Sequence, residues 1–148
     1  MATAIQVEAS KGGRSLDRAL AAARTADNNR GRDIVVLDLR HLTCVFDYFV
    51  VVTGTSRRQL HAISEEIDQT LEKQFGDERL GIEGYADSRW ILLDYGDVIV
   101  HMFDEETRRY YDLENLWSGA KMILLEGVTS RSDSPSHFAT VGEPLLGD

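Results

Sequence analysis

Apolar positions at intervals of three and four predict an amphipathic helix near the start of the chain. The pattern comprises Leu16, Ala19, Leu20, Ala23 and Ala26. These positions share one face of an α-helix, and the preceding Ser15 is a residue type that caps helix N-termini. The helix is expected to end before the segment 28–31, which holds two Asn and a Gly. Residues 1–14 show no such period and are expected to form a flexible lead.

Two unbroken apolar runs, rich in β-branched residues, predict strands that are covered on both faces. One run lies within residues 33–39 and the other within residues 48–53. Continuous apolar runs are typical of strands buried on both sides. The connection, residues 40–47, is too short for the helix of a parallel crossover, so we expect an antiparallel pair.

A longer amphipathic pattern follows the second strand. Its buried stripe is predicted to contain Leu60, Ile63, Ile67, Leu71 and Phe75. Ser56 is placed to cap this helix and Gly76 to end it. Two further short strands are predicted within residues 80–85 and 90–95.

The segment from Trp90 to Phe103 predicts a hairpin with a defined register. Gly96 and Asp97 suit the two central positions of a type II′ turn, which prefers Gly first. The predicted facing pairs are Tyr95 with Val98, Asp94 with Ile99, Leu92 with His101, and Trp90 with Phe103. A turn centred on Tyr95 and Gly96 would set two aspartates opposite each other, which is disfavoured.

After the hairpin, Asp104 can cap a last helix that runs through Arg108 and Tyr111 to Trp117. Residues 126–148 hold Ser, Asp and both prolines and are expected to form a flexible tail. The element order α-β-β-α-β-β-β-α predicts an α/β fold, a mixed β-sheet packed by helices, in one domain spanning residues 15–125.

The charge of the chain limits the partners it can bind. With 25 acidic and 16 basic side chains, the formal net charge is -9. A phosphate backbone would repel such a chain, so no direct nucleic-acid binding is expected and a basic protein is favoured as partner. No run resembles a signal peptide or a membrane span, which predicts a soluble, cytoplasmic protein without membrane contact.

Residue types that carry catalysis are present but not in catalytic patterns. The four histidines lack zinc-ligand spacing. A cation site would need carboxylates two apart on a strand, but Glu83 has no such partner, and Asp94 and Asp97 lie on either side of a turn. Gly54, Thr55 and Ser56 could receive a phosphate at a helix start, although a simple cap explains them as well. We therefore expect no catalytic residue, no metal and no cofactor, with a divergent nucleotidyltransferase as the alternative. Cys44 is expected to be a small buried apolar group.

Aromatic side chains are the strongest candidates for binding. Trp90 follows a polar segment and resembles an interface anchor, whereas Trp117 is expected to pack beneath the last helix. Of Tyr110 and Tyr111, one is expected to pack inward. His101 interrupts an apolar strand and is expected to be at least half-buried, bonded to Asp94 or to a backbone carbonyl.

Two segments carry a resemblance to a known family. They are WILLDYGDVIVHMF at residues 90–103 and RRYYDLENLW at residues 108–117, supported by DYF at 47–49 and TGTS at 53–56. The sequence resembles the ribosomal silencing factor family, also called the Iojap family, over roughly residues 16–117.

The resemblance implies a function in translation repression. Members bind a large-subunit ribosomal protein, number fourteen, at the subunit interface, and so block joining of the subunits. Their fold is similar to that of nucleotidyltransferases but without the catalytic carboxylates. The family's partner-binding Trp and Tyr match Trp90 and Tyr111, and we extend the surface, as a hypothesis, to Asp94, His101, Arg108 and Arg109. A homodimeric interaction module is a second alternative.

Overall fold

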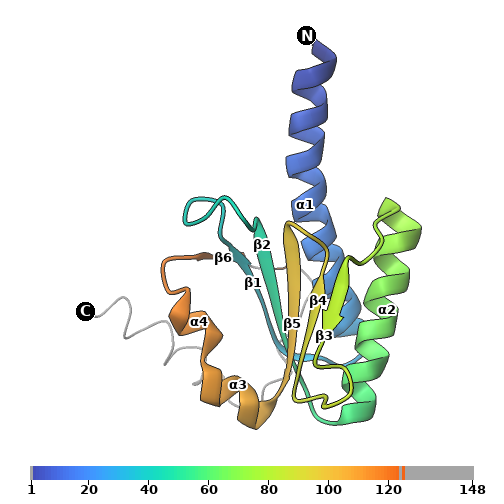
Figure 1. Ribbon diagram of the computed structural model, residues 1–148, viewed down its shortest axis with the longest axis vertical. Coiled ribbons are helices and arrows are strands. Elements are labelled where there is room, and N and C mark those ends of the chain that lie inside the picture. Colours follow the sequence, from blue (N-terminus) through green and yellow to red (C-terminus); the bar gives the residue numbers. More distant parts are fainter. Residues whose placement is uncertain (1, 124, 126–148) are drawn as a thin grey trace.

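A mixed six-stranded sheet with helices packed against it forms the body of the protein (Figure 1). The computed structural model describes residues 2–123 and 125, with side chains from Ser15 onward. The strand order is β3-β4-β5-β2-β1-β6. The strands are β1 (Arg32–Asp38), β2 (Tyr48–Gly54), β3 (Gly81–Glu83), β4 (Trp90–Asp94), β5 (Val98–Asp104) and β6 (Lys121–Ile123). The helices are α1 (Ala2–Asn28), α2 (Arg57–Phe75), α3 (Glu105–Tyr111) and α4 (Leu113–Leu116). The predicted α/β class is confirmed.

The two central strands are the most buried part of the sheet. All seven residues of β2 are buried, as its continuous apolar run predicts. β1 and β2 pair antiparallel, which confirms the prediction from their short connection. β2 also pairs with β5 in parallel, with Val50 opposite Val100, so the sheet is mixed.

The hairpin has the register that its turn residues predict. Tyr95 N donates to Val98 O at 3.0 Å, and β4 and β5 pair with Trp90 opposite Phe103. Gly96 has φ +90, a value that L residues rarely adopt, so glycine suits the first turn position. The side chains of β4 therefore alternate between the two faces of the sheet.

Helix α2 forms as its pattern predicts. The Ser56 hydroxyl accepts a hydrogen bond from Gln59 N at 3.1 Å, and the left-handed Gly76 ends the helix. The predicted stripe faces the sheet: Leu60, Ile63, Ile67 and Leu71 are fully buried, and Phe75 is partly buried.

The predicted start of the first helix is wrong. Helix α1 begins at Ala2, so Ser15 lies inside it and caps nothing. The hydroxyl of Ser15 is buried and donates to Asp97 in the hairpin turn at 2.5 Å, so a tertiary partner uses the group that suggested a cap. The side chains of residues 2–14 lie outside those described, and flexibility of this lead stays a prediction. The predicted tail, residues 126–148, also lies outside the described residues.

The region after the hairpin differs from the single helix predicted there. Asp104 caps α3 through a bond from Thr107 N, as expected, but Asp112 adopts a left-handed conformation with φ 47 and separates α3 from α4. β6 was not predicted. It pairs antiparallel with β1, with Met122 opposite Leu37, because β1 has a free edge there.

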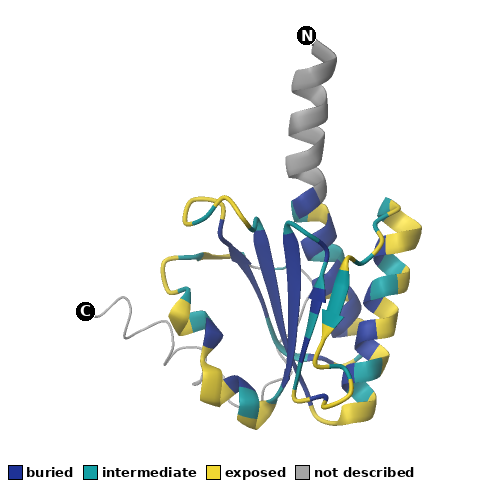
Figure 2. Ribbon diagram, in the orientation of Figure 1, coloured by how far each residue is buried: buried dark blue, intermediate teal, exposed yellow. Residues whose placement is uncertain are grey.

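Different helices lie on the two faces of the sheet (Figure 2). The face covered by α1 and α2 is mostly aliphatic, and we call it the aliphatic face; from the strands it includes Val36, Val50, Val52, Ile91, Leu93, Val98, Val100 and Met102. The face toward α3 and α4, the aromatic face, includes Val35, Leu37, Phe49, Val51, Ile99 and Phe103, with Trp90, Leu92, Phe46 and Trp117 packed against them.

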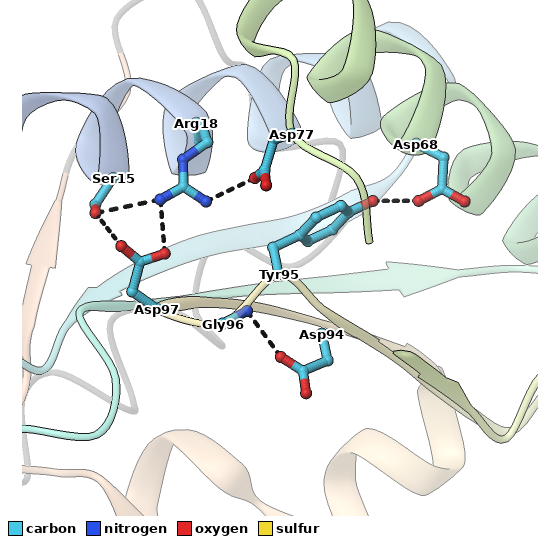
Figure 3. A network of polar contacts seen from close by, with 8 residues as sticks. All are labelled: Ser15, Arg18, Asp68, Asp77, Asp94, Tyr95, Gly96 and Asp97. Carbon is cyan, nitrogen blue, oxygen red and sulfur yellow. Dashed lines mark hydrogen bonds and ion pairs between the residues drawn. The ribbon is translucent and has the colours of Figure 1, made fainter. Parts of the chain in front are cut away.

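A charged network fastens α1 to the hairpin turn (Figure 3). The Arg18 guanidinium contacts Asp77 at 2.7 Å and Asp97 at 2.6 Å. Burial acts to raise the pKa of Asp97, but the hydrogen bonds from Ser15 and Arg18 outweigh it and hold that pKa below its usual value. Three segments distant in the sequence therefore meet through one guanidinium.

Candidate docking surface

A group of aromatic rings reaches the surface where β4 meets α3. Trp90 is half-buried, and its ring centroid lies 4.9 Å from that of Phe103 and 4.7 Å from that of Tyr111. Tyr110 extends the group, 5.0 Å from Tyr111 in an edge-to-face contact. Tyr111 is 46% exposed and Tyr110 is 81% exposed, so the expectation that one of them packs inward is wrong. Trp90 and Tyr111, the two residues that the resemblance singles out, are in contact.

The ring of His101 lies beneath Trp90. The indole Nε1 of Trp90 donates to Nδ1 of His101 at 3.1 Å, so the expected partner, Asp94 or a backbone carbonyl, is wrong. His101 is 4% exposed, and burial lowers its pKa to about 4, which keeps the imidazole neutral near pH 7. Its ring also meets Phe49 edge-on at 4.5 Å.

The remaining predicted residues have separate positions. Asp94 accepts a hydrogen bond from Gly96 N at 2.8 Å and lies at the far end of β4, about 13 Å from Trp90 at 3.3 Å per residue. Arg109 is exposed on α3. The structure thus brings together Trp90, His101 and Tyr111, whereas Asp94 lies apart from them.

Arg108 points inward. Its guanidinium donates to Glu114 at 2.9 Å and to the Thr53 hydroxyl at 2.7 Å, and the residue is 9% exposed. These bonds tie α3 to α4 and to the end of β2. Arg108 therefore holds the helix that carries Tyr111, and its charged group is already paired inside the protein.

The aromatic rings continue along the sheet through Phe49, Phe46 and Trp117, which were not among the predicted site residues. Phe49 contacts Trp117 at 5.6 Å and Phe46 at 5.3 Å between ring centroids. Trp117 packs against this face, as expected. The sequence held no signal for this continuation, because it depends on the parallel pairing of β2 with β5, which sets Phe49 opposite Ile99, two residues from His101 on the same face.

The loop between β1 and β2 is more exposed than predicted. Cys44 is exposed, so its expected burial is wrong. Leu42 is 44% exposed and Val45 is 64% exposed in the same loop. The connection turns at the surface through local hydrogen bonds, such as the one that Thr43 N donates to Leu39 O. Leu42, Cys44 and Val45 therefore stay exposed to solvent.

Within 2–123 and 125, no three His, Cys, Asp or Glu side chains gather as metal ligands would. No helix in that part of the chain is long and apolar enough to cross a bilayer. The exposed aromatic group therefore remains the leading candidate for a functional site.

Comparison with known proteins shows which family the chain resembles. Residues 13–143 match the family described as ribosomal silencing factor during starvation. The ribosomal silencing factor of Halalkalibacterium halodurans is 38% identical over 109 residues, which cover 74% of this chain and 92% of the relative. A mouse protein named mitochondrial assembly of ribosomal large subunit protein 1 is 36% identical over 89 residues, 59% of this chain and 39% of that protein.

A solved structure has the same architecture. The crystal structure of a Chromobacterium violaceum protein is 35% identical and superposes with a TM-score of 0.66, covering 77% of this chain and 94% of that one. Fold and matches together define a regulatory protein class associated with ribosomes. The chain belongs to the ribosomal silencing factor family. The implied likeness to nucleotidyltransferases stays a prediction.

Proposed function

We propose that this protein docks on the large ribosomal subunit through Trp90, Tyr111 and their exposed neighbours, and thereby prevents the small subunit from joining. The observation that carries the proposal is the contact between Trp90 and Tyr111 at the surface, 4.7 Å between ring centroids. Tryptophan and tyrosine are enriched at the energetic centres of protein interfaces. We place the protein in the cytoplasm, together with the ribosomes it would bind.

The proposed partner is a basic large-subunit protein, and ribosomal protein fourteen is the one that the family resemblance implies. The net charge of -9 favours such a partner because opposite charges speed and orient the encounter. The name of the mouse relative, which refers to assembly of the ribosomal large subunit, supports the choice of subunit. No chemistry is required, since a domain seated where the subunits meet excludes the small subunit by its volume.

The site residues divide into two roles in this proposal. Trp90, Tyr111 and Arg109 reach solvent and are proposed to touch the partner. His101 and Arg108 are buried and are proposed to act through Trp90 and α3 respectively. Asp94 stays a hypothesis as an outer contact, because its carboxylate already accepts from the hairpin turn.

Co-sedimentation with separated ribosomal subunits tests the proposal. Wild-type protein should sediment with the large subunit and not with the small one. Trp90→Ala and Tyr111→Ala should fold but stay in the supernatant, with affinity reduced at least about thirtyfold, the factor for a hot-spot residue of about 2 kcal/mol.

Tyr85→Ala is the matched control, because Tyr85 stacks on His61 of α2 with the ring centroids 3.9 Å apart, away from the aromatic group. The control should sediment as wild type does. Normal sedimentation of Trp90→Ala together with a changed mass in solution would refute the proposal and favour the homodimeric alternative.

A further inference from the structure

The hydrogen bond between Trp90 and His101 fixes which side of the indole can meet a partner. The only polar hydrogen of the indole, on Nε1, points to Nδ1 of His101 at 3.1 Å. His101 belongs to β5 and is 4% exposed, so this acceptor lies beneath the surface. The exposed part of Trp90 is therefore carbon, the ring itself.

The same bond determines the tautomer of His101. A neutral imidazole has one donor and one acceptor nitrogen, and Nδ1 is the acceptor here, so the proton must lie on Nε2. Nε2 is buried and has no hydrogen-bond partner among the residues that the structure describes. A buried donor without a partner costs free energy, so an aliphatic or aromatic residue would suit this position better for stability alone.

Within the described part of the chain, no second hydrogen-bond partner faces the polar atoms of His101. The rings that face it are those of Phe49 from β2, Trp90 from β4 and Phe103 from its own strand, and none of them titrates near pH 7. Burial alone accounts for the lowered pKa of His101. The retained imidazole therefore has one evident task, which is to accept the indole hydrogen.

We propose that His101 is a positioning residue for docking: it holds the Trp90 indole with its N–H turned inward and its ring presented beside Tyr111. This inference rests on the proposed function. It also specifies the chemistry of the partner at this point. An apolar side chain, or a cation placed over the ring, would complete the contact, and no acceptor for the indole N–H is needed.

Two substitutions of His101 separate positioning from packing. His101→Phe keeps a ring of similar size and removes the acceptor, while also removing the unpartnered Nε2–H. His101→Asn places its amide oxygen near the position of Nδ1 and can still accept from the indole. Both are made in the full chain, and Trp90→Phe identifies which of the two tryptophan indole signals belongs to Trp90.

The readouts are the indole N–H resonance of Trp90, its exchange with solvent, the melting temperature and the affinity for the large subunit. For His101→Phe we expect a shifted resonance, exchange at least about tenfold faster, and affinity weakened about fivefold to tenfold, the factor that one neutral hydrogen bond supplies. The melting temperature should stay near that of wild type, and His101→Asn should recover most of the affinity.

Three results would overturn the inference. The first is an unchanged resonance and affinity in His101→Phe while Trp90→Ala fails to bind, which leaves the proposed function intact. The second is an equal loss of affinity in both His101 variants with an equal loss of melting temperature, which shows a purely structural role. The third is wild-type affinity in Trp90→Ala, which refutes the proposed function itself.

A measurement on the wild-type chain applies even if His101→Phe fails to fold. The nitrogen resonances of the His101 ring between about pH 6 and pH 8 should show an unprotonated Nδ1 and a protonated Nε2. A proton on Nδ1 would exclude the bond from Trp90 and contradict the positioning role.

Discussion

The two faces of the sheet are built from the same strands but contain different residues. On the aliphatic face, α1 and α2 cover residues such as Leu93 and Met102 completely. On the aromatic face, α3 and α4 leave Trp90 half-buried, and Tyr111 of α3, which contacts Trp90, is 46% exposed. Burial alone explains the residue composition of the aliphatic face. The aromatic face retains exposed rings and a buried histidine that stability does not require, and the proposed docking role would account for them.

The largest predicted effect separates folding from binding. Ile67 of α2 is fully buried on the aliphatic face, so Ile67→Ala should lower the free energy of unfolding by about 2 to 5 kcal/mol. Tyr111→Ala should cost less than about 1 kcal/mol because the residue is largely exposed. Chemical denaturation measures both. If folded Ile67→Ala also lost affinity for the large subunit, the assignment of folding to the aliphatic face and of binding to the aromatic face would be wrong.

Acid should lower the free energy of unfolding, because His101 of the aromatic face binds a proton more readily in the unfolded chain. Its folded pKa of about 4 lies below the ordinary value of 6.5, so between these values the unfolded chain binds more protons than the folded one. Stability is then complete above about pH 6.5 and falls as the pH drops toward 4, by a total on the order of 3 kcal/mol.

The difference between wild type and His101→Phe isolates this contribution. The variant should show a shallower decrease of unfolding free energy over the same pH range, measured by denaturant titration at each pH. Parallel curves for the two proteins would show that His101 does not titrate as its burial requires.

The network of Arg18 belongs to the aliphatic side and should matter for stability alone. Arg18→Met keeps the aliphatic stem but leaves Asp77 and Asp97 without their shared cation, at a cost of about 2 kcal/mol. Arg58→Met, at an exposed position on α2, should change stability by less than about 0.5 kcal/mol. Thermal unfolding measures the melting temperatures of the two variants. Equal melting temperatures for the two variants would show that the network contributes nothing.

Salt should affect the encounter more than the bound complex. The acidic body is proposed to steer the protein to a basic partner, so the association rate should fall about tenfold between low and high salt. The dissociation rate depends on the rings and should change little. Stopped-flow mixing with large subunits measures both rates, and an association rate independent of salt would remove the electrostatic part of the account.

Features determined by neighbouring residues could be predicted from the sequence. The hairpin register followed from Gly96 and Asp97, and the cap of α2 followed from Ser56, because both depend on local backbone geometry. β6 could not be predicted in this way. Its three residues show no alternation, and they form a strand only because β1 offers a free edge.

Part of the candidate site could also be predicted, because it follows from the hairpin register. The register already placed Trp90 and His101 as diagonal neighbours on one face, which could have identified their bond. The inward turn of Arg108 was not foreseeable, since it depends on the left-handed Asp112 that brings Glu114 back toward α3.

The most direct test of the account is a subunit-joining assay followed by light scattering. Large subunits are incubated with the protein before small subunits are added. Wild-type protein and Tyr85→Ala should suppress formation of whole ribosomes, whereas Trp90→Ala and Tyr111→Ala should leave it near the level without added protein. Suppression by Trp90→Ala and Tyr111→Ala as strong as that by wild type would contradict the claim that the aromatic face is the docking surface.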